Sequence, residues 1–269
     1  MSHSGGNSSV RTVFGELTDV GQKRRHNEDH ILVREDLGLF VLADGMGGHK
    51  AGDVASNLAV SALVRFFETT VCQVYFGIPP EGFEHLEDDA LRLYFGLVKA
   101  NEEVHRASAV VGNHHGMGST IVVVYVAPDG NVHIGHVGDS RCYRVAAGQM
   151  ELLTEDHSFV NDVLKAKPDL PPEQLANLPA NIITRALGMR EDVEPSIRTE
   201  AASHGDVFVL CSDGLSGQVS GDEIHRIVGT AEDPQGVCRE LVDASNTAGG
   251  RDNVSVIVLR IDKAVSVAS

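Results

Sequence analysis

The sequence predicts an α+β fold, in which strands dominate and helices fall in blocks between them. Apolar runs typical of strands occur near the start, in the centre and at the end of the 269-residue chain. Two stretches with apolar residues at helical spacing lie together, between the early and the central strands. Because strands and helices do not alternate strictly, this order is favoured over a doubly wound parallel sheet.

The first part of the chain should contain three strands and two helices. The strands are expected over residues 10–17, 30–33 and 39–43. The third runs into Asp44-Gly45, where a glycine-rich turn should lead to a helix over residues 53–67. Apolar residues at helical spacing indicate a second helix over residues 86–98, and both helices should place one apolar face on a sheet.

The centre of the chain is typical of a β-meander. Strands over residues 120–127 and 132–137 flank a Pro-Asp-Gly turn at 128–130, which predicts a hairpin. Residues 141–146 are expected to add a third strand to it. Residues 157–184 hold four of the nine prolines, which predicts an irregular, mobile insert.

The last part of the chain returns to strands with a short helix between them. The strands are expected over residues 207–211 and 254–261. Ser220 and Glu223 form a capping box that should start the helix, and Gly229 is suited to end it.

One domain is expected, because no repeat, heptad or linker divides the chain and its length suffices for a large apolar core. We expect a disordered arm over residues 1–9, the folded domain over 10–262 and a frayed tail over 263–269.

Charge excludes some partners. The chain has 22 Lys and Arg against 38 Asp and Glu, a formal charge of -16, so its surface should repel nucleic acid. No apolar run approaches the ~20 residues that span a bilayer, and no secretory signal opens the chain. We therefore expect no membrane partner and a cytoplasmic location.

The four cysteines form no Cys-x-x-Cys pair and are expected to be reduced and mostly buried.

Four aspartates lie at the ends of apolar runs. Asp44, Asp139 and Asp213 follow such runs, and Asp252 precedes one. Because the ends of buried strands can converge on one rim of a layered domain, these acids are candidates for a shared site. Acids crowded together away from water repel one another unless cations neutralise them. All-oxygen ligands without cysteine favour hard cations such as Mg²⁺ or Mn²⁺.

Glycines accompany these acids and permit close backbone approach, so a carbonyl such as that of Gly45 is a further candidate ligand. A single Asp-Gly pair is more often only a turn, but four such sites in one acidic chain favour a metal site.

Residues 23–29 place cations beside two acids. This segment is either a charged surface loop, or it supplies an arginine that binds phosphate next to acids that hold a metal ion or its water. Composition leaves both interpretations open.

Seven motifs, in this order, resemble those of the metal-dependent protein phosphatases, the type 2C or PPM family, in its short bacterial form. They are Arg24-x-x-Asn27-Glu28-Asp29, Val41-Leu42-Ala43-Asp44-Gly45-Met46-Gly47-Gly48-His49, Gly116-Met117-Gly118-Ser119-Thr120, His136-Val137-Gly138-Asp139-Ser140-Arg141, Thr184-Arg185-Ala186-Leu187-Gly188, Leu210-Cys211-Ser212-Asp213-Gly214-Leu215 and Asp252-Asn253-Val254-Ser255. The resemblance implies a four-layer αββα sandwich with two central antiparallel β-sheets flanked by helices. It also implies a binuclear metal centre at one edge.

The resemblance further implies a role for each acid. Asp44 would bridge two Mn²⁺ or Mg²⁺ ions, with the Gly45 carbonyl on the second ion, and Asp213 and Asp252 would complete the first. Asp139 together with Asp213 matches the pair that binds a weaker third ion in bacterial members.

The remaining matches surround this centre. Glu28 and Asp29 correspond to acids that mostly hold metal-bound waters, and Asn253 corresponds to a polar neighbour of the metals. Arg24 corresponds to the arginine that grips phosphate, and residues 157–184 correspond to the flap beside the cleft.

His49 is a candidate general acid with an open role. In animal members the corresponding histidine directly follows the Asp-Gly pair, whereas Met46-Gly47-Gly48 intervene here. Histidine is suited to give a proton near neutral pH, but a loop histidine is as often an exposed bystander.

The implied function is hydrolysis of phosphoserine or phosphothreonine in proteins by direct attack of a metal-bridging water, with Arg24 anchoring the phosphate. The chain has neither a Cys-x5-Arg loop nor a Gly-x-Ser-x-Gly elbow, which agrees with a reaction without a phosphoenzyme. Partners would be phosphorylated proteins, including a Ser/Thr kinase and its substrates, and the protein is expected to be a monomer.

Other functions stay open. One is a pseudophosphatase that regulates a kinase by docking, although such proteins usually lack a metal acid or the arginine, and all of these are present. Another is a phosphatase of small molecules or of one dedicated protein partner. Residues 71–87 are either an unusual connection between the two helices or a docking surface.

Overall fold

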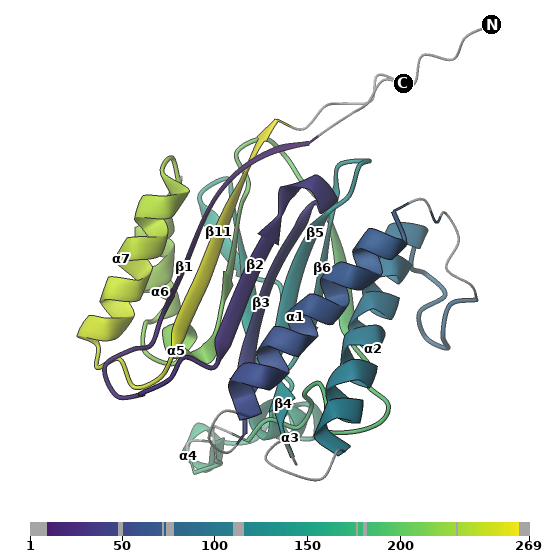
Figure 1. Cartoon of the computed structure of the whole chain (residues 1–269). Coiled ribbons are helices and arrows are strands. Elements are labelled where there is room, and N and C mark those ends of the chain that lie inside the picture. Colours follow the sequence, from purple (N-terminus) through teal and green to yellow (C-terminus); the bar gives the residue numbers. More distant parts are fainter. Residues whose placement is uncertain are drawn as a thin grey trace, which may run out of the picture.

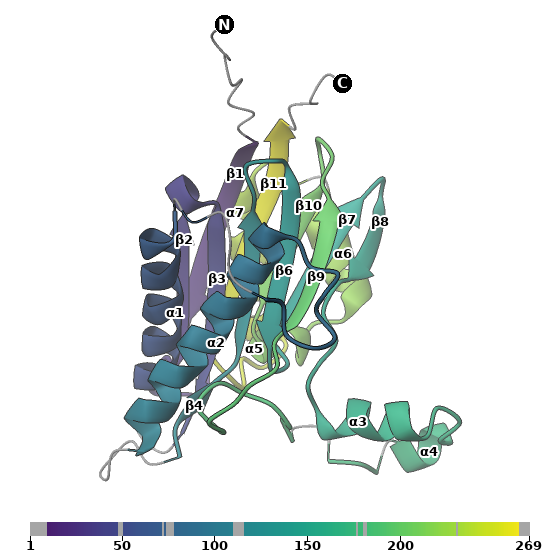
Figure 2. The ribbon, with the colours of Figure 1, turned by 90° about the vertical axis from the view of Figure 1, so that its right-hand side faces the viewer.

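Two antiparallel sheets stack face to face, and a layer of helices covers the outer face of each (Figures 1 and 2). This computed structural model describes residues 10–47, 51–71, 73, 78–109, 116–175, 177–179, 182–229 and 231–263. The four layers confirm the predicted α+β sandwich. The arm over residues 1–9 and the tail from 264 onward lie outside the described residues, and residue 263, assigned to the tail, is the last residue of a strand.

The first sheet has six strands, in the order β2-β3-β5-β6-β9, with β4 paired to β3. Its strands are β2 (Asp29–Arg34), β3 (Leu39–Met46), β4 (Gly118–Ser119), β5 (Ile121–Val126), β6 (Asn131–Val137) and β9 (Ser196–Ala201). The helices α1 (Ala51–Thr69) and α2 (Asp88–Ala109) cover its outer face, and the short 3-10 helix η1 (Glu35–Leu37) joins β2 to β3.

The second sheet has five strands, in the order β1-β11-β10-β7-β8. Its strands are β1 (Arg11–Asp19), β7 (Arg141–Ala146), β8 (Gln149–Leu152), β10 (Val207–Cys211) and β11 (Val254–Lys263). The helices on this side are α5 (Asp213–Ser216), α6 (Gly221–Val228) and α7 (Pro234–Thr247). Pairing of β1 with β11 joins the two ends of the domain.

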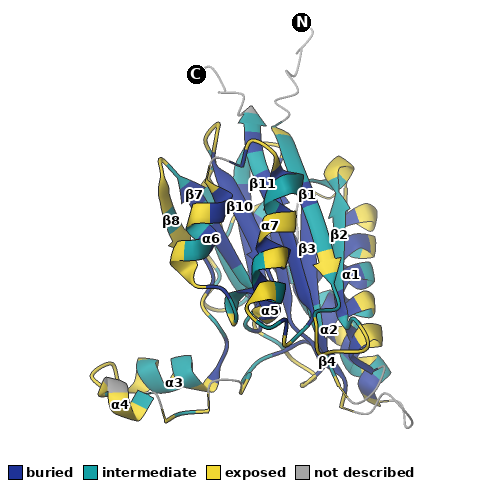
Figure 3. Cartoon of the chain, turned by 90° about the vertical axis from the view of Figure 1, so that its left-hand side faces the viewer, coloured by how far each residue is buried: buried dark blue, intermediate teal, exposed yellow. Residues whose placement is uncertain are grey.

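Three apolar clusters fill the spaces between the layers. Alternation along β3 shows how one strand serves two of them: Val41 packs with α1 and α2, whereas Leu42 packs between the sheets. The third cluster lies between the second sheet and its helices. Figure 3 shows this pattern as buried strands between helices that are exposed on their outer sides.

The predicted meander is wrong in its third strand. β5 and β6 form the expected hairpin, but β7 belongs to the other sheet, and β6 pairs with β9 instead. The chain changes sheets at Gly138, whose φ of 110° suits glycine and whose added Cβ would lie 2.7 Å from the Thr120 side chain.

The insert is more regular than its prolines predict. It contains α3 (Phe159–Ala166) and α4 (Pro172–Leu175), which project away from the sandwich (Figures 2 and 3). Ser158 provides the local cause, because its side chain accepts a hydrogen bond from the Asn161 N–H and so caps α3.

Other elements confirm or extend the predictions. α6 follows Ser220, whose Oγ accepts from the Glu223 N–H at 3.3 Å, and it ends at Gly229 as predicted. β3 runs three residues beyond the expected strand, because Gly45 and Met46 pair with β4. The strands β8 and β9 and the helices α5 and α7 were not predicted.

Cys142, Cys211 and Cys238 are buried free thiols, as expected, and Cys72 lies outside the described residues. Among the described helices, none combines the length and the apolar character needed to span a membrane.

Candidate metal centre

A cavity of about 370 Å³ opens at the edge of the sandwich where β3 ends and β11 begins, at the bottom of Figure 1 near α5 and β4. Its lining residues are Arg24, Glu28, Asp44, Gly45, Met46, Gly47, Thr120, Ile183, Met189, Asp213, Asp252 and Asn253. Most of the residues predicted for the site therefore share one cavity, although they come from segments far apart in the chain.

Strand pairing places the acids. Asp29 and Asp44 are direct partners in the register of β2 and β3, so they lie side by side at the same edge. Asp213 begins α5 two residues after the end of β10, and Asp252 lies two residues before the start of β11. Because β10 and β11 are antiparallel neighbours, the end of one and the start of the other meet at this edge.

Asn253 ties the N-terminal loop to this edge. Its Oδ1 accepts from the Glu28 N–H at 2.8 Å. Its Nδ2 donates to the carbonyls of Val20 at 3.0 Å and His26 at 2.9 Å. The predicted polar neighbour thus positions the segment that carries Arg24 and Glu28.

Asp29 lies behind the cavity and is 6% exposed. Its Oδ2 accepts from Ser212 Oγ at 2.9 Å and from Ser255 Oγ at 2.7 Å, while its buried Oδ1 has no hydrogen-bond partner among the described residues. Burial raises the pKa of Asp29 to about 7, although the two serine hydroxyls act in the opposite direction. The two serines were not predicted as site residues, but each lies within a quoted motif, next to or near a predicted ligand.

The other aspartates also have raised pKa values. Burial raises the pKa of Asp44 well above its usual range, and the charges of Asp29, Asp213 and Asp252 raise it further. Burial and the charge of Asp252 raise the pKa of Asp213. A hydrogen bond with Asp44 partly offsets this rise. A site that penalises its own negative charges in this way favours a cation.

Asp139 stands apart from this group. Burial raises its pKa to about 6, and the next cause is the charge of Asp213. Asp139 is therefore close enough to interact with Asp213, but it does not line the cavity. His49 lies outside the described residues, so its predicted role stays a prediction.

Arg24 reaches the cavity and pairs with one of the predicted ligands. Its Nη2 lies 2.6 Å from Oδ2 of Asp252, and both side chains are partly exposed. The hydrogen bond to Asp252 raises the pKa of Arg24, and burial partly offsets this rise. Arg24 thus lies beside a predicted ligand, and its role toward phosphate stays a prediction.

Gly45 lies where two segments approach too closely for a side chain. Its N–H donates to the Glu28 carbonyl at 3.0 Å, and a Cβ added to it would lie 2.0 Å from the Gly52 carbonyl oxygen. Thr120, a lining residue that was not predicted, donates its N–H to the Asp44 carbonyl at 2.8 Å and accepts from the Asp44 N–H at 3.1 Å. These contacts hold the Asp44-Gly45 backbone against α1 and β5.

These residues fit hard divalent cations. The oxygen donors are carboxylates and carbonyls, the described lining residues include no cysteine and no histidine, and Asp29 leaves a buried oxygen without a partner. Among the described residues, no group of three or more Asp, Glu, His or Cys side chains is arranged so that it could hold a metal ion as it stands. One oxygen of Asp252, Oδ2, is already engaged by Arg24.

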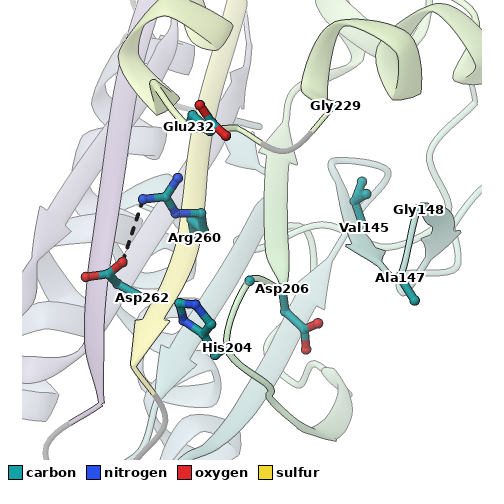
Figure 4. A pocket seen from close by; sticks show the side chains of 10 residues that line it. Val145, Ala147, Gly148, His204, Asp206, Gly229, Glu232, Arg260 and Asp262 are labelled. Atoms are coloured by element: carbon teal, nitrogen blue, oxygen red, sulfur yellow. Dashed lines mark ion pairs between the residues drawn. The ribbon is translucent and has the colours of Figure 1, made fainter.

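A second hollow of about 680 Å³ lies at the opposite end of β11, near Asp206 and His204 (Figure 4). Its charged residues largely pair with protein groups: Arg260 faces Asp262 at 3.7 Å, and Asp206 binds Arg144 at 2.5 Å. None of the predicted ligands lies there, so the edge beside β3 is the candidate site.

Comparison with known proteins identifies the family. A family model described as protein phosphatase 2C matches residues 21–244. The chain belongs to the protein phosphatase 2C family. This 2C-family phosphatase is 36% identical over 252 residues to protein phosphatase PhpP of Streptococcus pneumoniae, a match that covers 92% of this chain and 96% of that protein.

Solved structures resemble this 2C-family phosphatase closely. The Mycobacterium tuberculosis serine/threonine phosphatase PstP/Ppp has a TM-score of 0.79 and 30% identity, over 94% of this chain and 99% of that one. The catalytic domain of PstP in complex with two manganese ions has a TM-score of 0.78 and 29% identity, over 95% and 100% of the two chains. The predicted family, fold class and serine/threonine phosphatase activity are confirmed.

Proposed function

We propose that this phosphatase hydrolyses phosphoserine and phosphothreonine in proteins at the cavity between β3 and β11, with Mn²⁺ or Mg²⁺ held there. The observation that supports this most is the meeting of Asp44, Asp213 and Asp252, which come from three distant segments and line one cavity. Two ions would be held by these acids and the Gly45 carbonyl, and Asp139 with Asp213 would hold a third.

Two such cations, when bound, lower the pKa of a water molecule and neutralise charge on phosphoryl oxygens. The chain's own contribution is to hold the acids rigidly. Asp29 keeps its carboxylate oriented through Ser212 and Ser255, and Thr120 fixes the backbone of Asp44. Such support from behind a site keeps ligands in place without ordering them anew in each turnover.

Arg24 is proposed to anchor the phosphate. Its planar guanidinium can bind two phosphoryl oxygens at once, and only Nη2 is engaged in the contact with Asp252. When Asp252 serves as a metal ligand, the arginine loses this partner and its donors become free for the substrate. Arg24 is half-exposed, so this exchange needs no movement of buried groups.

Further proposals concern the setting of the reaction. We place the catalytic domain at residues 10–262 with the insert over 157–184 as its flap, the protein in the cytoplasm, and its active form as a monomer. Its phosphoprotein substrates would include a Ser/Thr kinase and the proteins that this kinase phosphorylates. Gel filtration with light scattering tests the monomer, and dephosphorylation of a purified, autophosphorylated kinase tests the substrate.

The deciding experiment removes one metal acid at a time. Asp44→Asn, Asp213→Asn and Asp252→Asn should each lower kcat/KM for a phosphothreonine peptide by at least about 100-fold, because each substitution removes a charge that holds the cations. Asp243→Asn on the exposed side of α7 is the matched control and should change little. EDTA should abolish activity, and added Mn²⁺ or Mg²⁺ should restore it.

Three outcomes would contradict the proposal. Full turnover in excess EDTA would exclude the metal-dependent reaction. A folded protein that binds Mn²⁺ but leaves both phosphopeptides and p-nitrophenyl phosphate intact would instead support the docking module. Faster hydrolysis of small phosphate esters than of every phosphopeptide would point to small-molecule substrates.

A further inference from the structure

A groove of about 910 Å³ lies beside the catalytic cavity. It runs between the base of the insert, the segment over residues 184–196, which leads into β9, and the segment that precedes α2. Its lining residues are Pro80, Glu81, Phe83, Tyr94, Glu155, Asp156, His157, Asp162, Lys165, Thr184, Arg185, Ala186, Met189, Arg190, Asp192, Val193, Glu194 and Ser196. Hollows of this size accommodate ligands larger than a phosphate group.

The groove is continuous with the catalytic cavity. Met189 lines both, and Ile183 of the cavity is followed directly by Thr184 of the groove. Met189 is 52% exposed, although it is a large apolar side chain, so it offers an uncovered contact at the junction. A polypeptide whose phosphorylated residue enters the cavity would therefore pass over Met189 into the groove.

Charges that already pair with each other contribute little to the character of the groove. Asp156 binds Arg141 through two hydrogen bonds, at 2.9 and 2.7 Å. Glu155 pairs with Lys165 at 3.1 Å. These four charges neutralise one another within the protein.

The charges that are left make the groove acidic. Arg185 and Arg190 are its other cations, and the Arg185 guanidinium donates to the Glu194 backbone carbonyl at 2.7 Å. The acids that remain, which form no ion pair among the described residues, are Glu81, Asp162, Asp192 and Glu194. Acids thus outnumber bases on a chain whose formal charge is -16.

We infer that this groove binds the part of a phosphoprotein substrate that flanks the phosphorylated residue, and that it selects flanks rich in lysine or arginine over flanks rich in aspartate or glutamate. Charge complementarity sets the sign of this preference, and continuity with the cavity sets its place. An apolar side chain next to the phosphorylated residue would pack on Met189. This inference rests on the proposed function of the cavity.

The test compares two phosphothreonine peptides that differ only in their flanks, one with lysine and arginine, the other with aspartate and glutamate. The readout is the ratio of their kcat/KM values on the same protein, in which the shared chemical step cancels. The native protein should prefer the basic peptide by about three- to tenfold at low salt, as expected for two or three exposed charge contacts. The preference should shrink in 0.5 M NaCl because salt screens such contacts.

A groove variant and a matched control locate the effect. Asp192→Asn combined with Glu194→Gln removes two exposed charges from the groove and should lower the ratio toward one. Glu240→Gln combined with Asp243→Asn removes two exposed charges from α7, in the outer helix layer of the other sheet, and should leave the ratio unchanged. Equal urea midpoints for both variants would show that folding is intact.

The outcomes separate this inference from the function itself. A native ratio near one, or a ratio that both variants lower equally, would contradict the inferred preference of the groove for basic flanks. It would leave the proposed phosphatase activity unaffected. Failure to hydrolyse either peptide or p-nitrophenyl phosphate in Mn²⁺ would overturn the proposed function, and the inference with it.

Discussion

At the scale of single residues, this protein places acids where their charges are unfavourable. Asp29 and Asp44 are neighbours across two paired strands, and burial raises the pKa of both. Such an arrangement lowers the stability of the fold unless a cation compensates it. The same acids are the best candidates for metal ligands and their supports, so we attribute this local cost to function.

Asp29→Asn should therefore stabilise the protein in EDTA. The pKa of Asp29 rises from an unfolded value of 3.8 to about 7 in the fold, so its ionisation lowers stability progressively as pH rises between these values. We expect the variant to gain on the order of 2 kcal/mol more at pH 8 than at pH 5, measured by urea unfolding. Saturating Mn²⁺ should remove the gain. A variant less stable than the native protein at both pH values in EDTA would contradict this account.

At the scale of elements, close backbone approaches hold the cavity together. β3 reaches the cavity because Gly45 leaves room for the Gly52 carbonyl at the start of α1. The base of the insert is held by a side chain, that of His157. This side chain accepts from the Gly138 N–H at 3.1 Å, and its ring stacks on His136 with centroids 4.6 Å apart.

Gly45→Ala should destabilise the protein by roughly 2–4 kcal/mol, because the new methyl group would have to displace backbone rather than a flexible side chain. Gly221→Ala at the start of α6 is the control. Its Cβ would meet only the end of the Met150 side chain at 3.7 Å, so stability should change little. Urea midpoints of both variants measure the difference. Equal midpoints would contradict the close approach of the Gly45 and Gly52 backbones.

His157 should make stability depend on pH. Burial lowers its pKa from 6.5 to about 3, with the neighbouring His136 as the next cause, so the unfolded chain takes up a proton between these values and the fold does not. The native protein therefore loses stability as pH falls below 6.5. His157→Asn should be less stable than the native protein at pH 8, and this deficit should shrink by about 2 kcal/mol at pH 5.

The exposed His204 supplies the control for that experiment. His204→Asn should have little effect at either pH. A deficit of His157→Asn that stayed constant between pH 8 and pH 5 would show that the ring is protonated in the fold.

At the scale of the whole molecule, the sandwich and the insert are separate in their packing. Residues described between 159 and 182 belong to none of the three apolar clusters. The insert closes at its base, where the Phe159 N–H donates to the Ile182 carbonyl at 2.9 Å. The two ends of the insert therefore lie side by side, and we expect the sandwich to fold without the segment between them.

Replacing residues 160–181 by two glycines should leave the sandwich folded, with a loss of less than about 1 kcal/mol, since a short loop can join ends that are already adjacent. Removing residues 234–247 should unfold the chain, because α7 buries Cys238, Leu241 and Val242 against the second sheet. Circular dichroism and urea unfolding measure both. Loss of cooperative unfolding in the first variant would show that the insert is part of the core.

Local patterns predicted most of the strands and the helices α1, α2 and α6, because alternation, helical spacing and a capping box are signals between residues close in the chain. The helices of the insert were missed because its prolines obscured the cap at Ser158. β8 and β9 lie at the edges of the two sheets, where few of their residues are buried, so their apolar patterns are weak.

The sequence by itself determined the chemistry of the site: acids at strand ends, glycines beside them and an arginine near by, in an order that indicates one family. Only the tertiary structure decided that β7 crosses to the other sheet, that Asp139 lies off the cavity, and that Arg24 binds Asp252 across 228 positions of the chain. Residue types and their neighbours are local properties, which a sequence displays directly. Which distant side chains meet depends on strand order and register, and these are fixed by packing the whole core at once.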